Sequence, residues 1–400
     1  MKRNNIGIGI LVLATLLVSM ALMPAVSAQE EEKYSVTAED AFRHANAHMI
    51  WFIANDTDFE KWYGAFIDPK PLDLYDPNGQ KLYYQFSVYK DNNIIGRIYI
   101  GADKQLGASV QLISFNPKPF DATEAMKKSI EIAKNEYPNG NIESTKMVVY
   151  DYPAIGAMTI VKDKTTGEEH RIFVDVYTLD VVEDKPATET APGIWSIYEH
   201  RLKNGIDENL KDWQKSDQLT KSVEQTAINN GVNIYVAVTE EKIRKLSGGE
   251  AITLATGKTL SVPLYGQETS NYCAAASGKM IAKYYGVVHT QTHIFGMMDQ
   301  GGYPDDQVYY YKTSKAAGGL EKTGSYHDDG YPNFTTLVSE INNYRPVVSL
   351  VPGHVRVCTG YSDTGFGLRY LKINDPMPVG SGSQYTETYG AETWRVYVKS

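Results

Sequence analysis

The spacing of apolar and polar residues predicts a helix followed by three strands, and then the same order again. A helix begins at Thr37-Ala38-Glu39-Asp40, where a hydroxyl residue three positions before an acidic one is typical of a capped helix start. A second helix begins in the same way at Asp121-Ala122-Thr123-Glu124. Alternating stretches after each helix predict strands at residues 82–89, 94–101 and 108–114, and at 144–152, 155–163 and 169–177. We therefore expect an α+β domain, a repeat of helix plus meander, over residues 29–184.

The rest of the chain divides into a linker and a second domain. Residues 185–259 are predicted to be a charged, partly helical linker, with helical pattern over 194–229 and 239–246. Residues 260–400 form the last block and contain both cysteines. Within it, Tyr309-Tyr310-Tyr311 is typical of a core strand.

The first 28 residues have the pattern of a secretion signal. Lys2-Arg3 precedes an uncharged apolar run over residues 6–23, and Val26-Ser27-Ala28 is a small-residue cleavage site. We expect a signal peptide over residues 1–28 and a secreted or extracellular product. The alternative is an uncleaved anchor that holds the protein at the cell surface, because the run is about as long as the shortest membrane span.

Composition excludes several classes of protein. The chain has 400 residues, 42% of them hydrophobic, which is enough for two or three packed domains. The net charge of −9 argues against a nucleic-acid partner, which needs a clustered basic face. Two cysteines cannot build a disulfide framework or a four-cysteine zinc site.

The chemistry of the last block centres on Cys273. Ser270 or Asn271 is expected to cap a helix over residues 274–285, so Cys273 falls in its first turn. Free N–H groups and the positive helix end favour a thiolate there. Gln267 lies six residues earlier and can supply an amide N–H beside that of Cys273, as a tetrahedral oxyanion requires.

A base and its orienting carboxylate are expected on later strands. His354 begins the second of two strands in residues 346–361, and a third strand over 369–374 ends at Asp375-Pro376. The Asp375 carboxylate can accept a hydrogen bond from the imidazole and fix its orientation. Cys273, His354 and Asp375 then form a set of nucleophile, base and orienter.

These residues resemble those of the papain-like cysteine peptidases, specifically the double-glycine (bacteriocin-processing) peptidase-like group. The similarity covers residues 260–400 and includes the Gln267-to-Cys273 spacing, the helix ending at Tyr285-Gly286, Gly353-His354 and Asn374-Asp375-Pro376. The resemblance implies a papain-like fold, with a helix that carries the cysteine and an antiparallel sheet that carries the histidine and aspartate. It also implies that Cys273 is the nucleophile, His354 the general base and acid, Asp375 the orienter and Gln267 the oxyanion donor.

The N-terminal domain resembles the PepSY and streptopain-propeptide modules that precede secreted peptidases. The similarity is in the order of elements and in two phrases, Leu82-Tyr83-Tyr84-Gln85-Phe86 and Gly96-Arg97-Ile98-Tyr99-Ile100. We therefore expect a secreted cysteine peptidase (a hydrolase) made as a zymogen. Its own residues 29–250 would act as an intramolecular inhibitor until the chain is cut between Asp184 and Thr259.

Other interpretations remain open from the sequence. The same fold could serve as a non-catalytic surface module that binds peptide or glycan, or could transfer the acyl group to an amine. A Cys273–Cys358 disulfide would exclude the nucleophile, but Cys358 lies four residues beyond His354, roughly 13 Å along a strand. The pairs His44/His48 and His289/His293 are expected to be surface or half-buried pairs. No metal or organic cofactor is expected, although calcium binding stays open.

Overall fold

The computed structural model describes residues 33–189, 191–203, 205–247, 255–329 and 333–400. The predicted signal peptide, residues 1–28, lies outside these ranges. Among the helices described, none is both long enough and apolar enough to cross a membrane.

The N-terminal half contains both predicted helices, and both are capped as expected. Thr37 Oγ1 accepts a hydrogen bond from the Asp40 N–H at 3.1 Å at the start of α2 (Ala38–Asn55). Asp121 accepts two hydrogen bonds from the first turn of α3 (Ala122–Glu136). The predicted strands are present with boundaries shifted by a few residues: β3 (Lys81–Lys90), β4 (Asn93–Gly101), β5 (Val110–Phe115), β6 (Gly140–Asp151), β7 (Ala154–Asp163) and β8 (Glu169–Asp175).

Several short elements of this half have no clear sequence pattern. They are the strands β1 (Phe66–Ile67), β2 (Leu72–Tyr75) and β9 (Val181–Val182), and the 3₁₀ turns η1 (Thr57–Trp62) and η2 (Lys104–Leu106). Two residues suffice to turn from β3 into β4, because Asp91 and Asn92 adopt φ values of 50° and 63°. Such left-handed residues match the twist of a tight hairpin.

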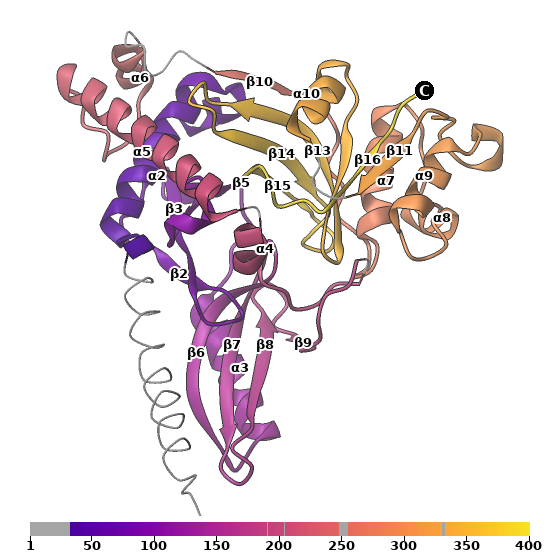
Figure 1. Cartoon of the computed structure of the whole chain (residues 1–400), viewed down its shortest axis with the longest axis horizontal. Coiled ribbons are helices and arrows are strands. Elements are labelled where there is room, and N and C mark those ends of the chain that lie inside the picture. The colour runs from indigo at the N-terminus through magenta and orange to yellow at the C-terminus, as the bar shows by residue number, and fades with distance from the viewer. Residues whose placement is uncertain (1–32, 190, 204, 248–254, 330–332) are drawn as a thin grey trace, which may run out of the picture.

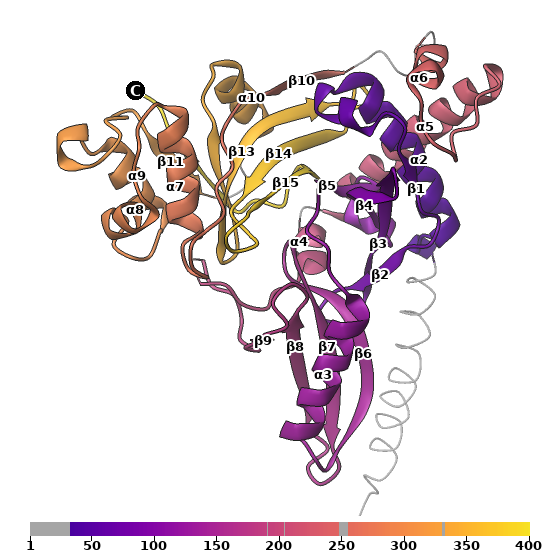
Figure 2. The same ribbon diagram turned by 180° about the vertical axis from the view of Figure 1, so that it is seen from behind.

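The predicted linker is largely ordered and packs against the N-terminal half. It forms α4 (Ile197–Lys203), α5 (Ile206–Asn229), α6 (Glu240–Leu246) and the strand β10 (Thr256–Thr259). Figures 1 and 2 show α5 and α6 beside α2 on the outer side of the molecule.

The last block combines a helical part with antiparallel strands. Its helices are α7 (Cys273–Tyr284), α8 (Gln291–Met297), α9 (Pro304–Lys312) and α10 (Phe334–Asn342), with a 3₁₀ turn η4 (Lys315–Ala317). Its strands are β11 (Tyr326–Asp329), β12 (Val347–Val351), β13 (His354–Asp363), β14 (Arg369–Asp375), β15 (Ser383–Thr388) and β16 (Trp394–Tyr397). A buried hydrogen bond from Ser277 Oγ to Val355 O, 3.1 Å long, fixes α7 against β13.

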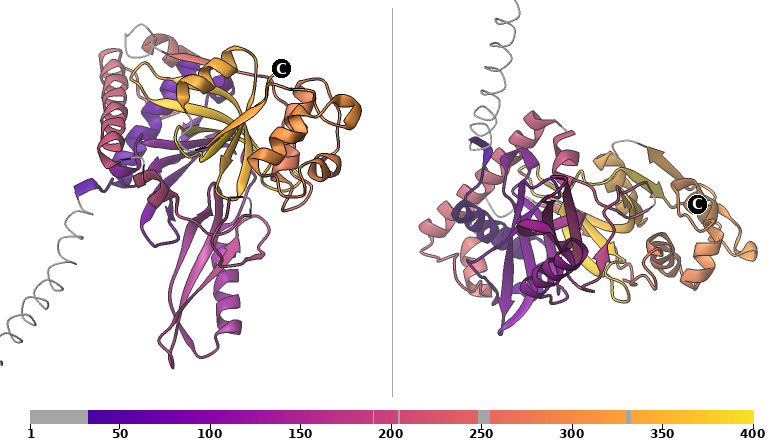
Figure 3. Two further views of the ribbon diagram at one scale, coloured as in Figure 1. Left: turned by 45° about the vertical axis from the view of Figure 1, so that its right-hand side comes forward. Right: turned by 90° about the horizontal axis from the view of Figure 1, so that it is seen from below.

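One sheet runs through both halves of the described chain. Its order is β11-β16-β12-β13-β14-β15-β5-β4-β3-β2-β6-β7-β8-β9. The halves join where β15 pairs antiparallel with β5, with Tyr385 opposite Ser114. Beyond this junction, β6, β7 and β8 extend away from the rest of the molecule with α3 on one face, as Figure 3 shows.

Buried charges also join the two halves. Lys372 on β14 donates to Asp56 Oδ1 at 2.7 Å and to Asp58 Oδ2 at 2.6 Å, and both carboxylates lie just after α2. Lys372 is 7% exposed, so removing the two carboxylates would leave a buried ammonium unpaired. The N-terminal half therefore supports the sheet that carries His354 and Asp375.

Two local predictions are wrong. Tyr309-Tyr310-Tyr311 belongs to the helix α9 rather than to a strand, although Tyr310 and Tyr311 are fully buried as core residues. Aromatic residues favour strands only as far as packing allows, and Tyr303-Pro304 begins a helix here. His44 and His48 are not on the surface: both are buried on α2, where they contact Ser109 Oγ at 3.0 and 3.3 Å.

Candidate active site

Cys273 is the first residue of α7, as the sequence predicts, but the helix cap differs from the prediction. The N-cap is Tyr272, and no side chain caps the helix. Asn271 lies in a turn that precedes the helix, where its Oδ1 accepts from Thr269 Oγ1 at 2.7 Å. The first N–H groups of α7, including that of Cys273, are therefore left without a side-chain acceptor. An anion that forms at Cys273 would find donors and a positive helix end.

His354 and Asp375 face each other from adjacent strands. His354 begins β13, Asp375 ends β14, and His354 Nε2 lies 2.7 Å from Asp375 Oδ1. Because Asp375 holds Nε2, the Nδ1 atom is the ring nitrogen left for Cys273, which lines the same cavity and contributes to raising the pKa of His354. The three predicted residues of the triad therefore meet, although they come from one helix and two strands.

The charge on His354 is strongly stabilised. Burial alone would lower the pKa of His354, but the charge and hydrogen bond of Asp375, together with those of Cys273, raise it to about 10. Burial would likewise raise the pKa of Asp375, and the imidazolium of His354 keeps it below its usual value. The arrangement favours an imidazolium beside a carboxylate at neutral pH, which is the environment that stabilises a thiolate.

A buried network, absent from the sequence prediction, holds Asp375 from behind. Tyr385 Oη donates to Asp375 Oδ2 at 2.7 Å and accepts from Arg356 Nη1 at 2.9 Å. Arg356 in turn forms a buried double hydrogen bond with Glu387, at 2.8 and 3.0 Å. Tyr152, from the N-terminal half, donates to the same carboxylate at 2.9 Å. Strand alternation places Arg356 on the face of His354, but it cannot reveal that β15 supplies Tyr385 and Glu387.

Gln267 is anchored at the same site. Its backbone N–H donates to Pro376 O at 2.9 Å, and its carbonyl accepts from Gly380 N at 2.8 Å, so the loop after Asp375 holds it. The side chain is 1% exposed and its Nε2 donates to Thr269 O at 2.9 Å. A primary amide carries a second N–H on Nε2. That hydrogen is available for an oxyanion.

The four predicted residues share one cavity, which the N-terminal half partly encloses. The cavity has a volume of about 580 Å³ and is lined by Gln267, Cys273, His354 and Asp375 on one side and by residues of β4, β5 and β6 on the other. Asp151, at the end of β6, is one of these. Burial raises the pKa of Asp151 to about 7, although the charge of His354 opposes that rise. The cavity is therefore built by both halves of the chain.

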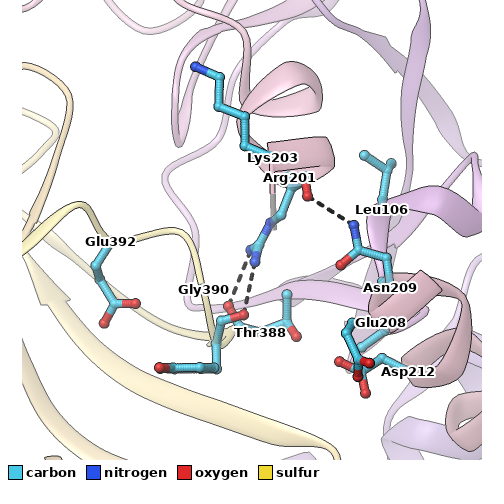
Figure 4. Close-up of a pocket in the computed structure, with 12 residues that line it drawn as sticks. Leu106, Arg201, Lys203, Glu208, Asn209, Asp212, Thr388, Gly390 and Glu392 are labelled. Atoms are coloured by element: carbon cyan, nitrogen blue, oxygen red, sulfur yellow. Dashed lines mark hydrogen bonds between the residues drawn. The ribbon is translucent and has the colours of Figure 1, made fainter. Parts of the chain in front are cut away.

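A second cavity between the halves, of about 340 Å³, contains none of the predicted catalytic residues. Figure 4 shows Arg201 at its centre, donating to the carbonyl oxygens of Thr388 and Tyr389 at 3.2 and 2.9 Å. Asn209 donates to the backbone carbonyl of Arg201 at 2.9 Å. These contacts fasten α4 and α5 to the loop after β15.

The disulfide alternative is contradicted, because Cys273 and Cys358 are both free. Cys358 is fully buried, as expected of a small core residue, and burial raises its pKa to about 12. Within the part of the chain that the structure describes, no three His, Cys, Asp or Glu side chains are grouped as metal ligands.

Comparison with known proteins finds similarity to a peptidase family over the last block. The Peptidase_C39 like family matches residues 259–400. The peptidase domain of Streptococcus ComA, a bi-functional ABC transporter involved in a quorum-sensing pathway, is similar to this chain at 18% sequence identity and a TM-score of 0.25. That match covers 35% of this chain and 99% of the ComA domain. None of the curated proteins matches the sequence. The family match supports a cysteine-type peptidase in residues 259–400, whereas the resemblance of residues 29–184 to propeptides stays a prediction.

Proposed function

We propose that the chain is a secreted cysteine peptidase that hydrolyses peptide bonds through Cys273, His354 and Asp375. The observation that carries the proposal is the contact of His354 with Asp375 through Nε2, with Nδ1 left for a cysteine at an uncapped helix start. The family match over residues 259–400 supports the same class of reaction.

The reaction follows from the positions of these groups. Cys273 Sγ, as thiolate, attacks the peptide carbonyl carbon, and the C=O electron pair moves to the oxygen. The N–H of Cys273 and Nε2 of Gln267 donate to that oxyanion. The imidazolium of His354 gives its Nδ1 proton to the departing amine as the C–N bond breaks. His354 then takes a proton from water, which attacks the thioester, and the acid product leaves with Cys273 regenerated. Asp375 keeps the imidazole ring in place throughout.

Active-site labelling of the full chain tests this proposal. We expect an iodoacetamide or epoxide probe to modify Cys273 stoichiometrically, in the intact chain or, if the chain is latent, after it is cut between Asp184 and Thr259. We expect His354→Ala to reduce the rate of labelling in the same form by at least 100-fold, because the thiolate loses its counterion. Mass spectrometry of the labelled peptide identifies the cysteine. Equal labelling of the His354→Ala variant, with its fold intact by circular dichroism, would remove the thiolate–imidazolium pair from the proposal.

Secretion follows from the sequence pattern and has its own test. We expect mature protein in the culture medium to begin at Gln29, which mass spectrometry of its N-terminal peptide can show. Recovery of the whole chain in the membrane fraction, starting at Met1, would favour the uncleaved anchor.

Latency is the finer part of the proposal. Residues 185–189 and 191–195, which we call the strap, lie back to back through a hydrogen bond from Ile194 N to Lys185 O at 2.7 Å. A methyl group on Gly353 would lie 2.6 Å from Ala191 O, so the strap presses against the turn before His354. Pro192 also lines the catalytic cavity. These contacts support the strap as the segment that restricts access to Cys273.

A nick in the strap tests latency better than deletion of the N-terminal half. Deletion would remove β5, which pairs with β15, and the two carboxylates that pair with Lys372. The sheet that carries His354 and Asp375 would be destabilised. We would place a specific protease site at residues 187–189, which are half-buried or exposed. We expect cleavage to increase both probe labelling and turnover. A matched nick in the exposed β7–β8 turn, at residues 165–167, is expected to change neither. Unchanged activity after complete cleavage of the strap would show that it is only a connector.

A further inference from the structure

A buried arginine without an ion-pair partner lines the catalytic cavity. Arg97 on β4 is 3% exposed, and its Nη1 has no hydrogen-bond partner. Its Nη2 donates to Lys118 O at 3.2 Å, and its guanidinium carbon lies 4.3 Å from the centre of the Phe120 ring. Within the described residues, no carboxylate forms a salt bridge with it, and a buried charge is normally paired.

Two other buried arginines are paired with carboxylates, whereas Arg201, also 3% exposed, donates to two backbone carbonyls. Arg356 forms a double hydrogen bond with Glu387, and Arg395 donates to Glu392 at 2.9 Å. Arg97 differs from Arg201 in that it lines the catalytic cavity and leaves Nη1, a terminal guanidinium nitrogen, without a partner.

A second cation lies at the same end of the cavity. Lys118 also lines it, and its ammonium lies 5.6 Å from the centre of the Tyr177 ring, without a salt bridge among the described residues. Asp175, Asp180 and Glu183 line the cavity as well. Asp175 accepts from Tyr150 Oη at 2.8 Å and from the N–H groups of Tyr177 and Thr178, and Glu183 pairs with Lys185 at 2.8 Å. Arg97 and Lys118 are therefore two cations that line the cavity and form no salt bridge among the described residues.

The sheet register relates Arg97 to the triad. Arg97 pairs with Ser114, and Ser114 pairs with Tyr385, so the three side chains lie in one row on one face of the sheet. Tyr385 is the residue that contacts Asp375. Two strand spacings put Cα of Arg97 about 10 Å from Cα of Tyr385. Ser114 Oγ, between them, is also buried without a partner and lines the cavity.

We propose that Arg97, with Ser114 and Lys118, binds a carboxylate of the peptide substrate in the cavity that Cys273 also lines. The proposal rests on the peptidase function and adds a specificity for acidic peptides. A carboxylate can accept two parallel hydrogen bonds from a guanidinium, and the Phe120 ring already holds that plane in place.

The carboxylate could belong to an acidic side chain or to the C-terminus of the peptide, and the experiment separates the two. Full-length protein, nicked in the strap if latent, is incubated with a peptide library, and the products are sequenced by mass spectrometry. Cleaved peptides are then remade as Glu/Gln pairs at the preferred position, and as C-terminal acid/amide pairs. We expect the wild-type protein to prefer the carboxylate member of one pair by about 10- to 100-fold in kcat/KM.

Variants of Arg97 show whether this residue causes the preference for carboxylate peptides. We expect Arg97→Gln to abolish the preference by slowing the carboxylate peptide alone, and Arg97→Lys to retain part of it. Lys127→Gln, at an exposed position of α3, removes a positive charge elsewhere and should leave the preference unchanged. If Arg97→Gln fails to fold, the wild-type rates on matched peptides and the Arg97→Lys variant still test whether Arg97 binds the carboxylate. Equal rates on both members of every pair would overturn the proposal and leave the peptidase function intact.

Binding provides the readout that does not depend on turnover. Calorimetry with the Cys273→Ala protein is expected to show tighter binding of the carboxylate peptide, and Arg97→Gln in that background should remove the difference. If no Cys273-dependent cleavage occurs at all, the proposed function fails, and this measurement alone decides on the carboxylate site. Equal affinities for acid and amide peptides would then overturn the site as well.

Discussion

The two cysteines of this chain are the same residue in two opposite environments. Both are buried, Cys273 at 8% exposure and Cys358 at 0%, and both are free. Cys358 lies within β13, its thiol directed to the carbonyl of Gly360 at 3.3 Å, and burial holds its pKa near 12. Cys273 begins a helix and meets a histidine that a carboxylate keeps charged. Burial alone therefore does not decide the chemistry of a thiol; the donors and charges around it do.

The largest expected effect separates the two thiols directly. Cys273→Ala should abolish peptide hydrolysis, because no other group in the cavity can form the thioester. Cys358→Ala should retain turnover within about threefold and lose only the stability of a small core truncation, about 1–2 kcal/mol. Hydrolysis rates and denaturant unfolding of both variants provide the measurement. Persistent activity in Cys273→Ala, or its loss in a folded Cys358→Ala, would reverse the comparison.

Much of this contrast can be predicted from the sequence. The helix pattern after Tyr272 and the strand that begins at His354 suffice to place Cys273 and His354 on elements of the right type. Helix starts and short alternating strands are local signals, which is why α2, α3 and β6 to β8 also agree with their predictions.

What could not be predicted depends on pairing between distant segments. No local pattern indicates that β15 pairs with β5, yet that pairing brings Tyr385 and Arg97 into one row. The contact of Lys372 with Asp56 joins residues 316 positions apart. Tyr310 is buried as predicted but on a helix, because the pattern of its neighbours fits both kinds of element.

Asp375→Asn should make the surroundings of Cys273 resemble those of Cys358. The pKa of His354, raised to about 10 largely by Asp375, keeps the ring charged below that pH and neutral above it. In the wild type, kcat/KM should therefore fall only as pH rises through about 10. Without the carboxylate, burial lowers the pKa of His354, and the fall in kcat/KM should move to pH 6.5 or below. We expect a loss of about 10²- to 10⁴-fold at pH 8. A pH profile from 5 to 11 measures it, and an unchanged alkaline limb would contradict the role of Asp375.

Gln267→Ala tests the donors around Cys273 while leaving the thiolate in place. Loss of one oxyanion donor costs on the order of 3 kcal/mol, so kcat should fall about 100-fold. Probe labelling of Cys273 should change little, because alkylation forms no oxyanion at a carbonyl. The difference between the two assays is the expected result. Unchanged turnover would remove Gln267 from the site.

Tyr385→Phe is expected to have the smallest effect, and it tests the network behind the triad. The change removes the donor to Asp375 Oδ2, while Arg356 keeps its two bonds to Glu387. A buried carboxylate oxygen without its donor destabilises the charged form, so the pKa of Asp375 should rise and the acid limb of kcat/KM should move to higher pH. We expect about a tenfold loss in kcat with KM nearly constant, because Tyr385 acts by positioning Asp375.

The matched control is Tyr370→Phe, which removes an equally buried hydroxyl that has no hydrogen-bond partner. It should leave the pH profile unchanged. If both variants lower only the melting temperature and neither moves the acid limb, Tyr385 is a packing residue and the reactivity of Cys273 depends on His354 and Asp375 alone.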